Sequence, residues 1–226
     1  MDKNVELRVH KIEKSISDVC CASSRNPEDV TLICVSKSVG IETTEEVVLS
    51  GITNFAENRI EPFLEKKAYF KNRTDLVWHF IGNLQRRKVK NVINEVDYFH
   101  ALDSLRLAEE IQKRANHTIK CFLQINVSGE ESKRGIKPNE AVQFLKDVQP
   151  LVNIKVVGLM TMAPIDAVVP ELHHYFSELR DLRDSIQKRE MSHAPCTELS
   201  MGMSQDYKIA VEEGSTFVRI GTAFFN

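Results

Sequence analysis

The chain lacks the features that mark membrane-bound, secreted and strongly nucleic-acid-binding proteins. Its 226 residues contain no apolar run of the ~18 residues that a membrane-spanning helix needs. The N-terminus, from Met1 to Asn4, is not followed by an apolar signal segment. The 30 lysines and arginines are balanced by 32 acidic residues, so no basic field favours nucleic acid. We therefore expect neither a membrane nor a nucleic acid among its partners.

Paired cysteines are missing as well. The chain has five cysteines, an odd number, and none of them forms a CxxC pair. Cys20 and Cys21 are adjacent, and the others are scattered. Disulfide frameworks and zinc sites need regular spacings, so this pattern predicts reduced thiols in a cytoplasmic protein without a metal site.

What the sequence does contain is a regular alternation of extended and helical hydrophobic patterns. The predicted strands are 31–37, 53–58, 76–81, 96–101, 119–127, 154–162, 197–201 and 216–220. The predicted helices are 4–22, 43–50, 59–70, 84–94, 103–115, 138–149, 170–188 and 206–213, with Thr43-Thr44 and Asp103 as expected N-caps. Strands that alternate with helices over short connections indicate βαβ units around a parallel sheet.

Two α/β architectures fit this alternation, a closed barrel and a doubly wound open sheet. Eight units in roughly 200 residues match the lower size of a (β/α)8 barrel. Neither a GxGxxG motif nor a P-loop follows the first strand, which favours the barrel. No linker or low-complexity segment divides the chain. We therefore predict a single domain over residues 1–226, a TIM barrel with an extra N-terminal helix.

The first predicted strand delivers a lysine at its end. Val30–Val35 is a short apolar run, and Lys37 follows it at the rim where barrels build their sites. Desolvation beside an apolar strand favours the neutral amine, which is a nucleophile for carbonyl carbons. A solvated lysine at a strand end is the simpler interpretation of this stretch on its own.

Glycine and hydroxyl residues follow the last two predicted strands. The stretch Leu199–Asp206, LSMGMSQD, runs from a strand through Gly202 and Ser204 into the start of a helix. Gly221 and Thr222 follow the eighth strand. Backbone N–H groups and hydroxyls in such loops bind phosphate, and this is the usual phosphate site of a TIM barrel. Ordinary turn chemistry is the alternative interpretation.

In a closed barrel the first strand and the last two strands are neighbours. A phosphate site beside a carbonyl-trapping lysine favours pyridoxal 5′-phosphate (PLP), bound as a Schiff base on Lys37. A sugar-phosphate aldolase would use similar groups. The residues alone therefore leave both chemistries open.

Several blocks of the sequence resemble those of the pyridoxal phosphate homeostasis protein family, in the same order. The most distinctive is His79–Lys88, HFIGNLQRRK, in which Arg87 stands where the family usually has asparagine. The other matching blocks are Val35–Lys37, Phe55–Arg59, Ser132–Gly135, Gly158–Met162, Leu199–Asp206 and Val218–Gly221. The resemblance extends from near Val5 to the end of the chain.

The resemblance implies a barrel of the alanine-racemase N-terminal-domain type that binds PLP. Lys37 would form the Schiff base, and Arg219 would face the pyridine nitrogen. The other residues implied at the cofactor are Asn58 beside the ring, Met160 and Ser200 in the pocket wall, and Met203, Ser204, Gly221 and Thr222 at the phosphate.

An arginine at the ring nitrogen has a chemical consequence. Arginine stays protonated, so Arg219 donates a hydrogen bond but does not readily give up a proton, and an unprotonated ring is a weaker electron sink. Alanine racemases add a second β-domain and a tyrosine acid/base. None of Tyr69, Tyr98, Tyr175 and Tyr207 lies at the C-terminal end of a predicted strand. The second catalytic group of a racemase is therefore expected to be missing.

We accordingly expect a non-enzymatic protein that holds PLP and takes part in intracellular PLP (vitamin B6) homeostasis and supply, with effects on amino-acid balance. Its expected partners are PLP and apo forms of PLP-dependent enzymes, and we expect a monomer. A small PLP-dependent amino-acid racemase remains an alternative, as does a partner-binding barrel with a vestigial site.

Two further features are interpreted as structural. His79 is expected to be a histidine near the core that bonds to the backbone, rather than a catalytic group. The basic helix predicted over 84–94 is interpreted as a solvated face, because a run of charge on a helix usually faces water.

Overall fold

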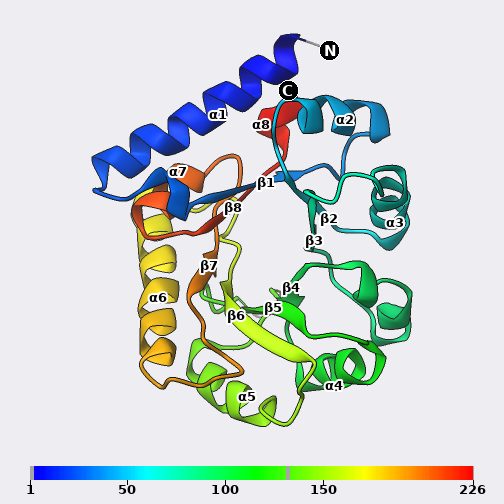
Figure 1. Cartoon of the computed structure of the whole chain (residues 1–226). Coiled ribbons are helices and arrows are strands. Elements are labelled where there is room, and N and C mark those ends of the chain that lie inside the picture. The colour runs from blue at the N-terminus through cyan, green and yellow to red at the C-terminus, as the bar shows by residue number, and fades with distance from the viewer. Residues whose placement is uncertain (1–2, 131–132, 226) are drawn as a thin grey trace.

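Eight parallel strands close into a barrel in the order in which they occur in the chain (Figure 1). This computed structural model describes residues 3–130 and 133–225. The strands are β1 Thr31–Val35, β2 Asn54–Glu57, β3 Val77–Phe80, β4 Tyr98–Leu102, β5 Ile119–Gln124, β6 Ile154–Met160, β7 Glu198–Ser200 and β8 Phe217–Ile220. The barrel closes because β1 pairs with β8 as well as with β2. The predicted (β/α)8 architecture is confirmed.

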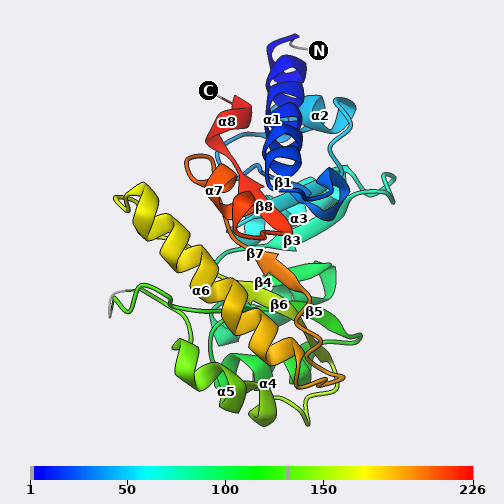
Figure 2. The ribbon, with the colours of Figure 1, turned by 90° about the vertical axis from the view of Figure 1, so that its left-hand side faces the viewer.

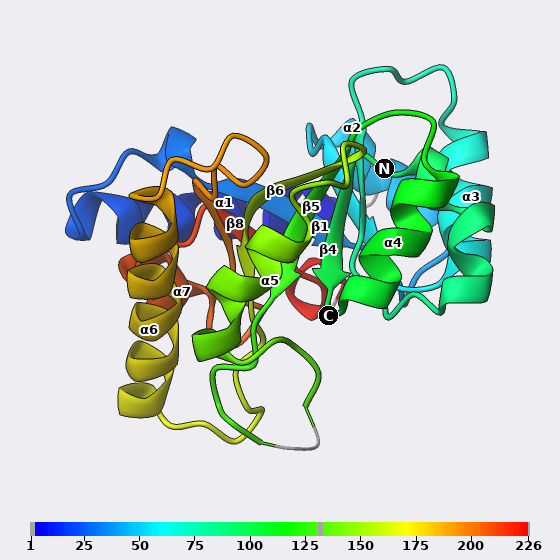
Figure 3. The ribbon, with the colours of Figure 1, turned by 90° about the horizontal axis from the view of Figure 1, so that it is seen from below.

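Helices cover the outside of the barrel, and the views of Figures 1 and 3 show them ringing the strands. They are α1 Lys3–Ala22, α2 Ile41–Leu49, α3 Ile60–Tyr69, α4 Leu105–Arg114, α5 Ala141–Asp147, α6 Val169–Gln187, α7 Tyr207–Glu212 and α8 Thr222–Phe225. Short 3-10 segments η1 Pro27–Asp29, η2 Arg86–Asn91, η3 Ile93–Glu95 and η4 Pro138–Glu140 lie in the connections. Within the described ranges, no helix has the length and apolar character needed to cross a membrane.

The extra N-terminal helix α1 packs across one side of the barrel, against α2, α7 and α8 (Figure 2). Its buried face is an apolar stripe with helical spacing, made by Val5, Val9, Ile12, Ile16 and Cys20. On the same helix Ser15 accepts a hydrogen bond from the Tyr207 hydroxyl at 3.0 Å. The amphipathic pattern of residues 4–22 therefore attaches this helix to the elements that follow β7 and β8.

Two apolar layers make up the core. The larger layer lies between the strands and the helices. The smaller one fills the inside of the barrel and consists of Ile33, Val35, Ala56, Phe122, Val157, Met160 and Phe217. Branched aliphatic residues usually fill such barrels. Here four completely or nearly completely buried polar side chains share the interior, namely those of His79, His100, Ser200 and Arg219.

The basic stretch predicted as a helix over 84–94 forms two 3-10 segments instead, η2 and η3. The break falls at Val92, whose φ of -139° lies outside the helical region and whose N–H bonds to Val89 O. Val89, Val92 and Ile93 are buried against the barrel. Their i, i+3, i+4 spacing also fits an α-helical stripe, so the spacing does not account for the break, and the segment follows the barrel surface in short turns.

Two predicted helix caps also differ in the structure. Helix α2 begins after Gly40 rather than at Thr44, whose hydroxyl donates back to Gly40 O at 2.8 Å. The residue that precedes α4 is Ser104, not Asp103. Asp103 instead accepts from Arg134 at 3.2 Å, so its carboxylate joins two loops at the C-terminal rim. In both cases another hydrogen bond, local for Thr44 and between distant loops for Asp103, occupies the side chain that the sequence suggested as a cap.

Candidate functional site

The C-terminal ends of the strands gather the predicted site residues at one rim of the barrel. Lys37 follows β1, which lies between β2 and β8. Its side chain is exposed, and it makes no hydrogen bond or ion pair with the residues that the structure describes. The apolar strand before Lys37 favours a desolvated amine, whereas the structure presents an accessible one. An accessible and unpartnered primary amine can react with a carbonyl compound that enters from solvent.

A buried ion pair fixes the backbone from which Lys37 projects. Lys66 Nζ lies 2.6 Å from Glu57 Oε1 and donates to the carbonyl oxygen of Ser36 at 2.7 Å. The hydroxyl of Ser36 donates to the same Glu57 oxygen at 2.7 Å. Ser36, Glu57 and Lys66 are not among the site residues predicted from the sequence. The signal was a charged Glu57 at the end of an apolar strand, which needs a partner when buried.

Two buried oxygen atoms beside this network have no partner among the described residues. They are Glu57 Oε2 and Asn58 Oδ1. The loop at Asn58 is tightly packed, because a Cβ on Gly82 would lie 2.0 Å from the backbone oxygen of Asn58. An unpaired buried acceptor is costly, so both atoms fit a site that is completed by a polar ligand.

The two loops predicted to hold phosphate lie side by side and are hydrogen-bonded to each other. The Gly221 N–H donates to the Ser204 hydroxyl oxygen at 3.2 Å. Thr222, which begins α8, is exposed. The Met203 N–H is already donated to Asp206 Oδ1 at 2.5 Å. Burial raises the pKa of the Asp206 carboxyl, and its bond from the Met203 N–H opposes this shift.

Arg219 projects from β8 into the inside of the barrel and is almost completely buried. Its Nη1 donates to Ser200 Oγ at 2.6 Å, and its Nη2 donates to the carbonyl oxygen of Thr161 at 2.9 Å. Burial lowers the pKa of the guanidinium to about 10, an effect that the nearby Asp206 opposes. Arg219 therefore remains a cation at neutral pH, and two of its five N–H groups are held by these acceptors.

The expectation that the His79 ring bonds to the backbone is wrong. The ring is completely buried, as predicted, but its nitrogens contact the side chains of His100 and Asn54 rather than the backbone. Burial lowers the pKa of His79 to about 3, and Lys120 adds to this shift. Burial also lowers the pKa of His100 well below its usual value, with further contributions from His79 and Arg219. Both rings are neutral at physiological pH.

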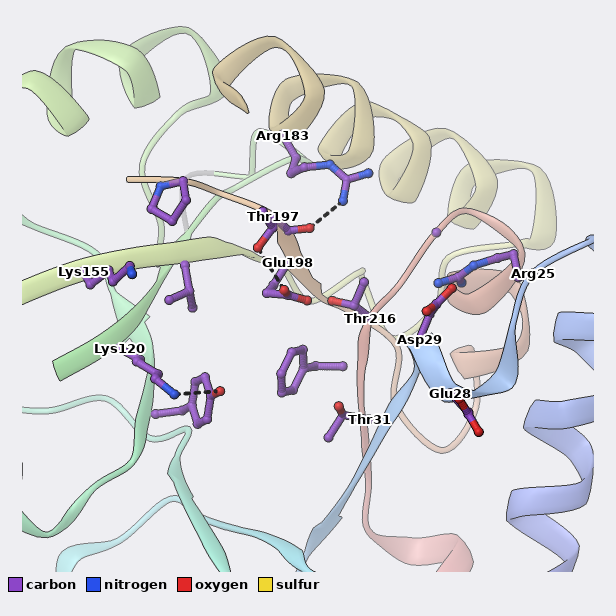
Figure 4. A pocket seen from close by; sticks show the side chains of 15 residues that line it. Arg25, Glu28, Asp29, Thr31, Lys120, Lys155, Arg183, Thr197, Glu198 and Thr216 are labelled. Atoms are coloured by element: carbon purple, nitrogen blue, oxygen red, sulfur yellow. Dashed lines mark hydrogen bonds between the residues drawn. The ribbon is translucent and has the colours of Figure 1, made fainter. Parts of the chain in front are cut away.

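A hollow of about 710 Å³ lies at the other end of the barrel, where the strands begin (Figure 4). Its wall carries both signs of charge, including Lys120, Lys155 and Glu198. The Lys120 ammonium lies 4.8 Å from the ring centre of Tyr98. The active sites of TIM barrels lie at the opposite rim, where the strands end, so this hollow is not assigned to the candidate site. No cluster of potential metal ligands occurs among residues 3–130 and 133–225.

Comparisons with known proteins identify the family. A family model described as alanine racemase, N-terminal domain, matches residues 20–226. The pyridoxal phosphate homeostasis protein of Aquifex aeolicus is 39% identical over 221 residues, which cover 96% of this chain and 96% of the relative. That of Schizosaccharomyces pombe is 34% identical over 209 residues, which cover 89% of this chain and 86% of the relative.

The chain belongs to the pyridoxal phosphate homeostasis protein family. Solved structures agree with this assignment. PipY of Synechococcus elongatus, in a structure with PLP bound, has a TM-score of 0.81 to this family member at 31% identity, and the match covers 93% of this chain and 100% of PipY. In the sequence blocks that suggested the family, Ser132 lies outside the described residues.

The barrel is also that of alanine racemases. An alanine racemase of Clostridium difficile 630 has a TM-score of 0.75 at 16% identity, and the match covers 99% of this chain but 56% of the racemase. At this identity the likeness shows the fold alone. The predicted alanine-racemase type of barrel is thereby confirmed for this member of the homeostasis protein family.

Proposed function

We propose that the protein binds PLP through a Schiff base on Lys37 and holds it for intracellular supply, as part of vitamin B6 homeostasis. The observation that carries the proposal is the accessible, unpartnered Lys37 amine at the end of β1, next to β8 with its buried Arg219. The PLP-bound structure of PipY, a relative that matches almost the whole chain, supports the choice of cofactor. An effect on amino-acid balance would follow from the supply of PLP.

Each end of the cofactor has a suitable group. Lys37, an exposed primary amine, would hold the aldehyde end of PLP. Ser204, Gly221 and Thr222 offer hydroxyl and N–H groups to the phosphate from loops that already contact each other. The Met203 N–H can join them only by leaving Asp206.

The ring of the cofactor would lie between polar and apolar walls. Asn58 fits a place beside the ring, because its buried Oδ1 has no partner among the described residues. Met160 belongs to the apolar interior of the barrel and supplies a wall. Ser200 is completely buried, and both of its hydrogen bonds are made to His100 and Arg219. We therefore infer that Ser200 acts on the bound cofactor indirectly, by holding the Arg219 side chain.

When bound, PLP supplies an electron sink for carbanion chemistry. Arg219 can donate a hydrogen bond to the ring nitrogen while it keeps its own proton, since even its lowered pKa is about 10. An unprotonated ring nitrogen weakens the sink. We infer that this arrangement favours holding the cofactor over turning over amino acids.

A racemase would need a second acid/base group opposite Lys37. The four tyrosines all lie in the described part of the chain, and none ends a strand: Tyr69 is in α3, Tyr98 begins β4, Tyr175 is in α6, and Tyr207 bonds to Ser15. To test for racemase activity, the PLP-loaded protein is incubated with chiral amino acids in deuterated water. The proposal expects no catalytic loss of the α-proton, and exchange at many turnovers would establish the racemase instead.

We further propose that the protein works as a single-domain monomer in the cytoplasm and passes PLP to apo forms of PLP-dependent enzymes. Transfer is tested by mixing the loaded protein with one such apoenzyme and following its recovered activity. Recovery faster than the rate at which the loaded protein releases free PLP would support direct delivery. Recovery at the release rate would reduce the role to buffering.

A further inference from the structure

A continuous line of hydrogen-bonded side chains crosses the inside of the barrel behind Arg219. Arg219 Nη1 lies 2.6 Å from Ser200 Oγ, which lies 2.9 Å from His100 Nδ1. His100 Nε2 lies 2.9 Å from His79 Nδ1, and His79 Nε2 lies 3.0 Å from Asn54 Oδ1. The members come from β8, β7, β4, β3 and β2, so the line joins opposite sides of the barrel.

The two ends of this line determine where each proton sits. Arginine can only donate, so Ser200 Oγ accepts from Arg219 and its own proton is available for His100 Nδ1. At the other end, Asn54 Oδ1 can only accept, so His79 carries its proton on Nε2. His79 Nδ1 is then an acceptor, and His100 Nε2–H donates to it. Both ends give the same tautomer for two neutral rings.

The line is built to orient groups and not to conduct protons. It ends at the amide of Asn54, which has no proton to pass on, and whose nitrogen donates to Thr53 Oγ1 at 3.2 Å. Every hydrogen bond points the same way, from Arg219 towards Asn54. Reversing any one of them would leave a buried donor or acceptor unpaired, which is costly inside a protein. The line therefore favours a single arrangement of the Ser200 hydroxyl.

We propose that Ser200, His100 and His79 are positioning residues that hold the Arg219 guanidinium in one orientation towards the ring nitrogen of the bound cofactor. The Ser200 oxygen and the carbonyl oxygen of Thr161 fix the two terminal nitrogens of Arg219. The remaining N–H groups are then presented in a fixed plane. This inference rests on the proposed PLP site and adds to it the device that aims its arginine.

Packing alone does not account for the two histidines. His79 stacks on Tyr98 with ring centres 4.9 Å apart, and His100 stacks on Phe122 at 4.3 Å. Apolar rings would make equal contacts without the cost of burying imidazole nitrogens. Satisfied polar networks in a core instead specify one arrangement of their members. The polar line is therefore better explained by what it holds, which is Arg219.

Two substitutions at His100 separate positioning from packing. The amide oxygen of asparagine falls near the place of Nδ1, so His100→Asn retains the acceptor for Ser200. The amide nitrogen of glutamine falls near Nε2, so His100→Gln retains the donor to His79 but loses the acceptor for Ser200. Glutamine is closer in size to histidine. If His100 only fills space, His100→Gln should be the milder change. If His100 holds Ser200 and through it Arg219, His100→Asn should be the milder change.

The first readout uses the protein without cofactor. In 15N NMR spectra, the Arg219 guanidinium signals are expected to stay resolved and slowly exchanging in wild type and His100→Asn, and to broaden or vanish in His100→Gln. The second readout is PLP affinity, from titration of the visible absorption band. We expect the PLP affinity of His100→Asn to remain within about threefold of wild type. The PLP affinity of His100→Gln should fall about tenfold, as expected if the charged Arg219 loses one hydrogen bond to the cofactor.

Tyr98→Phe is the matched control, because it removes a hydroxyl that lies beside the line without belonging to it. It should leave both readouts at wild-type values. Equal behaviour of the two His100 variants, or a milder effect of His100→Gln, would overturn the inference. If neither variant folds, the same comparison is made with His79→Asn, which keeps the acceptor for His100, and His79→Gln, which does not. Wild-type protein that binds no PLP would refute the proposed function, while the NMR comparison would still decide whether the line holds Arg219.

Discussion

The two histidines inside the barrel predict a loss of stability in mild acid. Burial lowers the pKa of His79 to about 3, whereas a histidine in an unfolded chain titrates near 6.5. Between these pH values His79 is protonated in the unfolded chain but neutral in the folded protein. The free energy of unfolding is therefore highest above about pH 6.5, and it falls as the pH drops towards 3.

The size of this effect follows from the pKa difference. A pH of 4.5 lies about two pH units below the pKa of a histidine in an unfolded chain, and each unit corresponds to about 1.4 kcal/mol. His79 alone should therefore remove about 2.7 kcal/mol of stability between pH 7 and pH 4.5. The pKa of His100 is lowered in the same direction, so it adds to the loss. This is a large part of the ~5–15 kcal/mol by which a typical domain is stable.

The assay compares urea unfolding of wild type and His79→Gln at both pH values. Glutamine does not titrate and retains a donor for Asn54, so the stability gap between the two proteins should shrink by about 2.7 kcal/mol at pH 4.5. Asp206, whose pKa is raised by burial, acts in the opposite direction but is shared by both proteins. An equal pH dependence in wild type and His79→Gln would refute the reasoning.

Three further substitutions, one of them with a matched control, test the packing around the site by denaturant unfolding at pH 7. Lys66→Met breaks a completely buried ion pair and leaves the Glu57 carboxylate unpaired, so it should cost about 3–5 kcal/mol; a cost below 1 kcal/mol would contradict this. Gly82→Ala places a Cβ 2.0 Å from a backbone oxygen and should cost at least about 1–3 kcal/mol, whereas Gly40→Ala meets nothing within 4 Å and should cost less. Arg134→Ala removes an ion pair of an arginine side chain that is 60% exposed, and it should change stability by less than about 1 kcal/mol.

The architecture was predictable because several strands have a clear local signal. Runs such as Val30–Val35 and Val156–Met160 are almost entirely apolar, as is typical of buried parallel strands, and helical stripes separate them. The chain from 84 to 94 was harder. Its basic residues suggested one solvated helix, but the buried Val89 and Val92 hold it in short turns against the barrel. Tertiary contacts of this kind have no local signature.

The candidate site was predictable where function sits at strand ends. Lys37 and the loops containing Ser204 and Gly221 could be found by reading the end of each strand, and the structure joins these two loops by a hydrogen bond. The supporting residues could not be found in this way. His100 and Lys66 look like ordinary members of a strand and a helix, and only the closed barrel shows which distant side chains they contact.

The central claim is that Lys37 holds PLP, and an absorption titration tests it most directly. Purified wild type, Lys37→Ala and the control Lys71→Ala, which removes an exposed lysine after α3, are each titrated with PLP and followed in the visible range. A band should appear in wild type and in Lys71→Ala, and borohydride reduction should leave the cofactor mass on the peptide that contains residue 37. The band should be absent from Lys37→Ala. A band of equal strength in Lys37→Ala, or no band in wild type, would contradict the account.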